Sequence, residues 1–199
     1  MATVPLAALR RFVSLREPEE HCDTCGAPLE RDHRHTFESA SQRVRCACES
    51  CSILYADIFR AIPEKIRSLP EFQLSDEVWN DLRIPISLAF FRYSTPAGRV
   101  IAQYPGPAGV TESLLPLEAW KQIESENPAL AAMESDVEAL LVNRVGRARD
   151  YFIVPVDECF RLAGVIRLHW RGLAGGALVW GKISEFLESL RRKGAACAL

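Results

Sequence analysis

The sequence predicts an α+β protein in which a small, zinc-ribbon-like metal module is followed by an α+β domain with an antiparallel sheet and helices. Three observations predict this fold. Five of the seven cysteines fall within residues 22–51, alternating apolar residues on both sides of a turn in residues 84–104 indicate a β-hairpin, and residues 179–190 carry apolar side chains at helical spacing. We expect an N-terminal arm (residues 1–20), a cysteine-rich metal-binding module (21–60) and an α+β domain (70–194).

The composition is that of an ordinary globular chain. With 199 residues, 48% of them hydrophobic, the chain is long enough for one domain and a small module. A formal charge of −2 leaves no excess of Lys and Arg to neutralise phosphates, so no nucleic-acid partner is expected. No apolar stretch approaches the roughly 20 residues of a membrane span, and no secretory cleavage pattern follows the apolar start. We therefore expect a cytoplasmic protein.

The first half of the domain predicts a helix and a hairpin. After a Pro-punctuated connector over residues 62–70, Ser75 is suited to cap a short helix that ends before Pro85. Residues 84–90 alternate as a strand should, and residues 99–104 return after a turn rich in Pro and Gly, which predicts an antiparallel hairpin. The following run Tyr104-Pro105-Gly106-Pro107-Ala108-Gly109 is expected to be an irregular loop.

The second half predicts three helices and another hairpin. Pro116 suits the first turn of one helix, and a second helix is expected from Pro128 through an apolar stripe that ends at Val145. Residues 151–156 and 162–170 are β-rich and predict a second hairpin. A last helix carries its stripe over residues 179–190, and Gly194 is expected to terminate it. The two hairpins should share a sheet with helices on one face, because each amphipathic element must bury its apolar side.

Two cysteine pairs carry the strongest chemical signal. Cys22-x2-Cys25 and Cys48-x2-Cys51 are separated by 22 residues, close to the spacing of zinc ribbons. Two intervening residues let a tight turn aim both sulfurs at one ion, and Gly26 permits a close turn behind the first pair. Such a short segment has few large apolar residues, so metal binding would have to supply most of its folding free energy. Zinc is the expected metal.

Further candidate metal ligands lie between the two pairs. They are His33, His35 and Cys46. If the chain turns back at residues 38–41, both histidines project from one face of a strand and Cys46 lies across from His33. One interpretation is that the histidines are solvated or hydrogen bond to the thiolates. The other is that the three residues hold a second metal or an iron centre; an iron–sulfur cluster would also use Cys and His, although ferredoxin and Rieske spacings are not matched.

Motifs for catalysis are incomplete. Gly176-x4-Gly181-Lys182 resembles the start of a P-loop, but Ile183 follows where a hydroxyl should coordinate magnesium. Cys159 and His169 have no evident orienting partner, and Cys197 is interpreted as a tail thiol. We find no catalytic residues to assign, and the sequence favours an accessory or interaction protein over an enzyme.

Several motifs together resemble a known family. They are Cys22-Asp23-Thr24-Cys25-Gly26 with Pro28-Leu29, His33-Arg34-His35, Cys46-Ala47-Cys48-Glu49-Ser50-Cys51, the Tyr104 to Gly109 run, Asp136-Val137-Glu138-Ala139-Leu140-Leu141, Pro155-Val156-Asp157, and Trp170-Arg171-Gly172 with Gly175-Gly176 and Trp180. With them the chain resembles an uncharacterised bacterial family, a domain of unknown function, that joins a cysteine-rich head to an α+β tail. Genes of such families are associated with clusters for NiFe hydrogenases of the aerobic, uptake type.

This resemblance implies an accessory role in hydrogenase assembly, metal or cluster delivery, or electron transfer. It implies no catalytic residue. The preferred hypothesis is therefore a metal-binding accessory protein that contacts a hydrogenase subunit or a maturation factor. The alternative is a redox or metal-transfer protein with an iron or second metal site at His33, His35 and Cys46.

Overall fold

The computed structural model describes residues 19–113 and 115–196. These residues confirm the predicted α+β class: they form five α-helices and two antiparallel sheets. Most of the expected N-terminal arm, and Cys197, lie outside the described residues. Among the described helices, none combines the length and the apolar character needed to cross a membrane.

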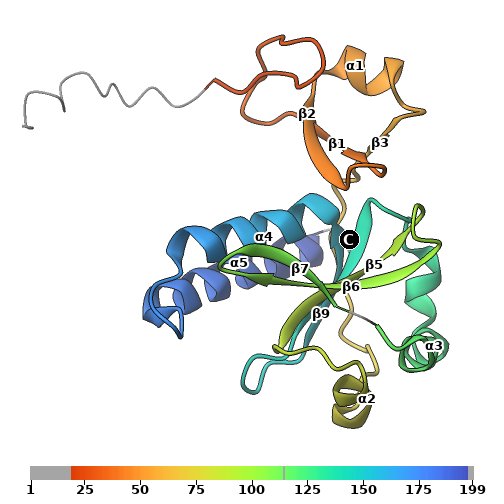
Figure 1. Cartoon of the computed structure of the whole chain (residues 1–199), viewed down its shortest axis with the longest axis vertical. Coiled ribbons are helices and arrows are strands. Elements are labelled where there is room, and N and C mark those ends of the chain that lie inside the picture. Colours follow the sequence, from red (N-terminus) through yellow and green to blue (C-terminus); the bar gives the residue numbers. More distant parts are fainter. Residues whose placement is uncertain (1–18, 114, 197–199) are drawn as a thin grey trace, which may run out of the picture.

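The smaller sheet belongs to the cysteine-rich segment. Its strands are β1 (Arg34–Glu38), β2 (Arg43–Ala47) and β3 (Phe59–Ala61), in the order β2-β1-β3, and the short helix α1 (Glu49–Leu54) follows β2. We call residues 21–61 the head. In Figure 1 the head lies at one end of the molecule, beside the larger α+β part. Phe37 is fully buried against Val137 and Val156, so the head shares apolar contacts with the rest of the chain.

The larger sheet has six strands in the order β4-β9-β8-β5-β6-β7, and every neighbouring pair is antiparallel. The strands are β4 (Arg67–Ser68), β5 (Leu88–Ser94), β6 (Arg99–Gly106), β7 (Gly109–Ser113), β8 (Glu138–Asn143) and β9 (Asp150–Pro155). The predicted hairpin is present as β5 and β6, where Phe90 faces Gln103, but its first strand begins at Leu88 and not at Ile84. Strand β5 also pairs with β8, which places β5 and β8 in the middle of the sheet.

Helices cover both faces of this sheet, whereas the sequence analysis predicted helices on one face only. The helices α2 (Asp76–Asp81) and α3 (Leu117–Glu126) pack with Phe91 on one face, and α4 (Val156–His169) and α5 (Gly176–Ala196) pack with Phe90 on the other. Figure 1 shows α4 and α5 lying side by side, away from α2 and α3. The reason is that the central strands are apolar at consecutive positions and therefore present two faces for burial.

The prediction of a helix from Pro128 to Val145 is wrong, because residues 138–143 form strand β8. All six of its residues are buried, and the neighbours Leu140 and Leu141 point to opposite apolar clusters. Only a short 3-10 helix, η2 (Pro128–Ala132), begins at Pro128. An apolar run that is buried on both sides satisfies a helical spacing as readily as a strand, so periodicity alone does not separate the two.

The second predicted hairpin is also wrong in its second strand. Residues 156–169 form helix α4, and β9 pairs with β8 and β4 instead. Leu162 and Ile166, one helical turn apart, are buried, whereas Leu168 is 66% exposed. Acidic residues in the first turn and basic residues in the last turn of α4 interact favourably with the helix dipole. These charges favour a helix although the segment is rich in residues that are common in strands.

Of three smaller sequence predictions, one is confirmed and two are wrong. Ser75 does cap α2, since its Oγ accepts a hydrogen bond from the backbone N–H of Val78 at 3.1 Å. The run expected to be an irregular loop instead continues β6 and β7, with Pro105 facing Val110 on the edge strand. Gly194 lies inside α5 rather than at its end. A Cβ atom there would lie 3.3 Å from the backbone nitrogen of Ser68, so this glycine allows α5 to approach β4 closely.

Candidate metal centre

The structure brings together the cysteines of the two Cys-x2-Cys pairs. The Sγ atoms of Cys22, Cys25, Cys48 and Cys51 all lie within 4.8 Å of one another. The Sγ atoms of Cys25 and Cys48 are 3.7 Å apart although the two residues are 23 positions apart in the sequence. Cys22 and Cys51 are buried, and Cys25 is exposed. A group of four sulfurs at this separation can hold one tetrahedral metal ion.

Local backbone geometry explains how each pair directs its sulfurs. Behind the first pair, the N–H of Gly26 donates to the carbonyl oxygen of Cys22 at 2.8 Å, and Gly26 has a positive φ of 72° that favours glycine. In the second pair, Cys48 is the N-cap of α1, and its sulfur accepts a hydrogen bond from the N–H of Cys51 at 3.4 Å. The two tight turns therefore present their sulfurs toward a common point.

The thiols of this four-cysteine group differ in acidity. Burial raises the pKa of the Cys22 thiol, but backbone N–H groups of Cys48, Cys25 and Thr24 outweigh burial and lower that pKa to about 6. Burial, followed by hydrogen bonds to the neighbouring cysteine side chains, raises the pKa of Cys51 to about 12. Without a cation, the group thus favours one thiolate and opposes the ionisation of another. A divalent cation removes this opposition and releases the proton.

A second group lies on the small sheet. One ligand atom from each of His33, His35 and Cys46 lies within 4.8 Å of the others. The turn at residues 39–42 creates this arrangement by pairing β1 with β2, and the pairing places Cys46 opposite His35, not opposite His33 as expected from the sequence. The two imidazole rings are 4.9 Å apart and nearly perpendicular. Cys46 and Cys48, two residues apart, thus belong to different groups.

Hydrogen bonds fix the orientation of both imidazoles. The Nδ1 atom of His33 lies 2.8 Å from the carbonyl oxygen of Glu30, and the Nδ1 atom of His35 lies 2.8 Å from Oδ2 of Asp157. The hydrogen bond to Asp157 raises the pKa of His35 above its ordinary value, against the opposite effect of burial. Sequence reasoning did not select Asp157, because it treated this residue as part of a hairpin connection and not as the first turn of α4.

A cleft of about 920 Å³ adjoins the second group. It is lined by both histidines and by residues of the head and of α4. Six of its lining residues are acidic and three are basic: Glu30, Asp32, Glu49, Glu64, Asp157 and Glu158 against Arg34, Arg161 and Lys193. The cleft therefore has an excess of negative charge, which favours the approach of cations.

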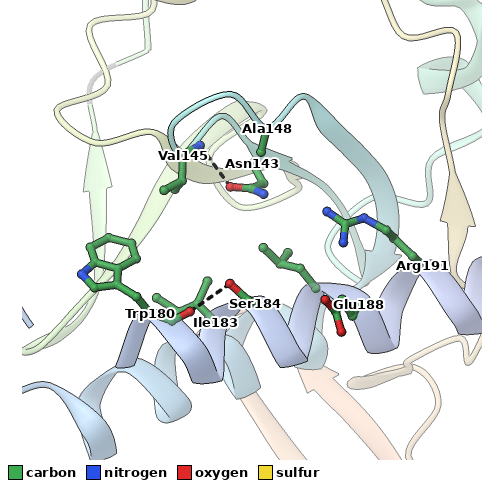
Figure 2. A pocket seen from close by; sticks show the side chains of 9 residues that line it. Asn143, Val145, Ala148, Trp180, Ile183, Ser184, Glu188 and Arg191 are labelled. Atoms are coloured by element: carbon green, nitrogen blue, oxygen red, sulfur yellow. Dashed lines mark hydrogen bonds between the residues drawn. The ribbon is translucent and has the colours of Figure 1, made fainter. Parts of the chain in front are cut away.

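Another pocket, of about 330 Å³, lies between α5 and the loop that joins β8 to β9. Figure 2 shows two of its polar side chains in hydrogen bonds: Asn143 accepts a hydrogen bond from the N–H of Val145 at 3.1 Å, and Ser184 donates to the carbonyl oxygen of Trp180 at 3.0 Å. Arg191 is paired with Asp150 at 2.6 Å. This pocket contains neither a nucleophile beside a base nor a cluster of metal ligands.

The remaining catalytic candidates are not brought together. Cys159 is fully buried in the apolar cluster under α4, and burial raises its thiol pKa well above the ordinary value. His169 lies on the same helix ten residues later, which corresponds to about 15 Å along the helix axis. Lys182 of the P-loop-like run pairs with Glu185 on the next turn of α5. These residues are therefore structural or surface groups.

Comparison with known proteins identifies a family. No curated protein and no solved structure matches the chain. The profile described as "Family of unknown function (DUF5947)" matches residues 21–194, a span that includes both candidate metal groups and the larger sheet. The chain therefore belongs to this family of unknown function.

Proposed function

We propose that this protein is a metal-binding accessory protein in which Cys22, Cys25, Cys48 and Cys51 hold one structural zinc ion. The observation that supports the proposal is the approach of the four sulfurs to within 4.8 Å of one another. Four thiolates complete the coordination of zinc and leave no open position, as in structural zinc sites. In this proposal, residues 21–60 form a metal-dependent module and residues 70–194 an α+β domain, to whose sheet the connector adds β4.

The small core of the head supports this role for the metal. Between residues 21 and 60, the buried apolar residues are Cys22, Phe37, Ala47 and Cys51. Two of these four are themselves candidate ligands, so apolar burial contributes little that is independent of the cysteines. Structural zinc contributes on the order of 10 kcal/mol or more at neutral pH. That contribution opposes the loss of conformational entropy when the loops of the head become ordered.

An exposed apolar surface on the head supports protein–protein contact. Ile53 is 69% exposed and Leu54 is 73% exposed at the end of α1, and Tyr55 and Ile58 are exposed nearby. We call these four residues the head patch. Contiguous exposed apolar residues of this kind are typical of interaction surfaces. The resemblance of the sequence motifs points to the partner, a NiFe hydrogenase subunit or a maturation factor in the cytoplasm.

Zinc content tests the structural part of the proposal. Elemental analysis of the purified protein should give one zinc per chain. Cys25→Ser should lose the zinc and the fold of the head, whereas the exposed His21→Ala, which belongs to neither metal group, should keep both. Absence of zinc from the native protein, or retention of one zinc by Cys25→Ser, would contradict a structural four-cysteine site.

Co-purification tests the accessory part. The tagged protein, expressed with a NiFe hydrogenase in one host, should retain a hydrogenase subunit or maturation factor. Leu54→Asp should abolish this retention and keep the zinc, because the side chain is exposed and is not a ligand. Leu173→Asp, at a leucine on the loop before α5 that is even more exposed than Leu54, is the control and should retain the partner. Equal retention by both variants would exclude the head patch as the contact surface.

A second candidate function, redox chemistry or metal transfer at His33, His35 and Cys46, is favoured by one observation. The Nε2 atom of His33 is buried and has no hydrogen-bond partner among the described residues. An iron centre would colour the anaerobically purified protein and add iron to its metal content. A colourless protein with one zinc, in contrast, would remove the redox function and leave an exchangeable, colourless metal as the remaining possibility.

A further inference from the structure

We propose that His33, His35 and Cys46 form a second metal site that binds one divalent transition-metal ion and keeps a coordination position open to the acidic cleft. This inference deepens the metal-transfer candidate and rests on it, but it does not require zinc at the four-cysteine group. The geometry that points to it is the combination of two oriented imidazoles, a thiol and a buried nitrogen without a partner.

The hydrogen bonds of the imidazoles leave the same nitrogen available on each ring. The Nδ1 atom of His33 faces the carbonyl oxygen of Glu30, which can only accept, so Nδ1 carries the proton. The Nδ1 atom of His35 likewise faces the carboxylate of Asp157. In both neutral rings, Nε2 then bears a lone pair. A histidine that ligates a metal typically shows this pattern, with its second nitrogen donating to a carbonyl or a carboxylate.

The buried state of His33 is costly unless Nε2 finds a partner. Its side chain is only 7% exposed, and Nε2 makes no hydrogen bond to any described residue. A buried polar atom without a partner costs about 1–3 kcal/mol. A metal ion bound by Nε2 would remove this cost. No such explanation is needed for His21, which is exposed and donates from Nδ1 to the carbonyl oxygen of Glu19.

The backbone holds Cys46 beside the histidines. Cys46 faces His35 across the β1–β2 pair, so strand pairing fixes the separation of the two residues. Asp23 further fixes this strand: its carboxylate accepts the N–H of Cys46 at 2.8 Å, and its own N–H donates to the carbonyl oxygen of Cys46 at 2.9 Å. Ligands on a paired strand keep their geometry without the metal, which lowers the cost of binding.

The number of ligands distinguishes this group from the four cysteines, since Cys48 also lines the cleft. A site with three protein ligands leaves a position for water or for a donor atom of another molecule. The cleft lined by His33 and His35 has more acidic than basic lining residues, so it provides a route that attracts cations. Two imidazoles and one thiolate suit zinc, cobalt, nickel or copper. The second site is therefore suited to an ion that exchanges, and the four-cysteine group to an ion that stays.

Cobalt(II) is a suitable probe because it binds such ligands more weakly than zinc and does not displace zinc from thiolates. The zinc-containing protein should take up one equivalent of cobalt without losing zinc, and its absorption should include a thiolate-to-cobalt band. Cys46→Ser should lose that band, and His33→Ala should bind cobalt at least about tenfold more weakly. Both variants should keep one zinc and the native circular dichroism spectrum, and His21→Ala should behave as the native protein.

Two results would overturn the inference: no cobalt uptake by native protein that contains one zinc, or equal uptake by native protein and His33→Ala. Failure of the structural zinc proposal would give a different metal content and a different absorption spectrum. In that case the purified protein contains no zinc, and cobalt bound to the four cysteines gives a thiolate band that persists in Cys46→Ser. The two proposals can therefore fail separately.

Discussion

The Nδ1 atom of His35 lies 2.8 Å from Oδ2 of Asp157, a residue 122 positions later in the sequence. This hydrogen bond joins strand β1 of the head to the first turn of α4. The orientation of one candidate metal ligand is thus set by the α+β part of the chain. A metal that binds or leaves at His35 would change a contact between the two parts.

Asp157 should therefore act as a positioning residue. Asp157→Asn is expected to weaken cobalt binding at the second site about 10–100-fold, because a neutral amide holds the imidazole less firmly and lowers its basicity. Asp157→Glu should restore part of the affinity. Titrations followed by the cobalt absorption bands would measure both, and zinc at the four cysteines should stay at one per chain. Unchanged cobalt affinity in Asp157→Asn would show that the hydrogen bond has no role in binding.

A buried ion pair should stabilise the junction between the head and the larger sheet. Asp136 and Arg92 are both fully buried and 3.6 Å apart, and Asp136 also accepts from Ser39 of the head at 2.9 Å. Asp136→Asn keeps the size of the side chain and suits its positive φ, but leaves the charge of Arg92 without its counterion. We expect the free energy of unfolding to fall by about 3–5 kcal/mol.

Urea unfolding would measure this loss. The matched control is Glu185→Gln, which removes an exposed ion pair with Lys182 on α5 and should cost less than about 1 kcal/mol. Equal stabilities of the two variants would mean that the buried pair does not hold the junction.

Two leucines test the assignment of α4 as a helix. Leu162 is fully buried and Leu168 is 66% exposed, although an alternating strand would place both on one face. Leu162→Ala should lower the free energy of unfolding by about 2–5 kcal/mol, and Leu168→Ala should change it by less than about 0.5 kcal/mol. Thermal or urea unfolding distinguishes the two outcomes, and similar losses from both substitutions would favour the strand.

The sequence predicted correctly those features of the fold that depend on adjacent residues. The Cys-x2-Cys turns, the Ser75 cap and the hairpin of β5 and β6 each depend on a few adjacent residues. It led to wrong predictions for segments whose burial depends on elements far away in the sequence. Strand β8 is covered on both faces, so its apolar run carries no period that separates it from a helix.

The partner of His35 illustrates the same limit in the candidate site. Asp157 reaches the head only because β9 and α4 bring the start of α4 against β1, and no local motif reports a contact across 122 residues. Likewise, the sequence could place His33 and His35 on one face of a strand, but the register that puts Cys46 opposite His35 depends on the length of the turn between β1 and β2.

Backbone hydrogen exchange during zinc removal tests the central claim most directly, namely that the four cysteines hold a zinc ion that organises the head. The protein should start with one zinc per chain. After complete chelation, the amides of Thr36 and Arg45, which face each other in the β1–β2 pair, should lose their protection, while those of Leu140 and Leu141 in β8 should keep it. Unchanged protection of Thr36 and Arg45 in protein shown to be free of metal would contradict the claim.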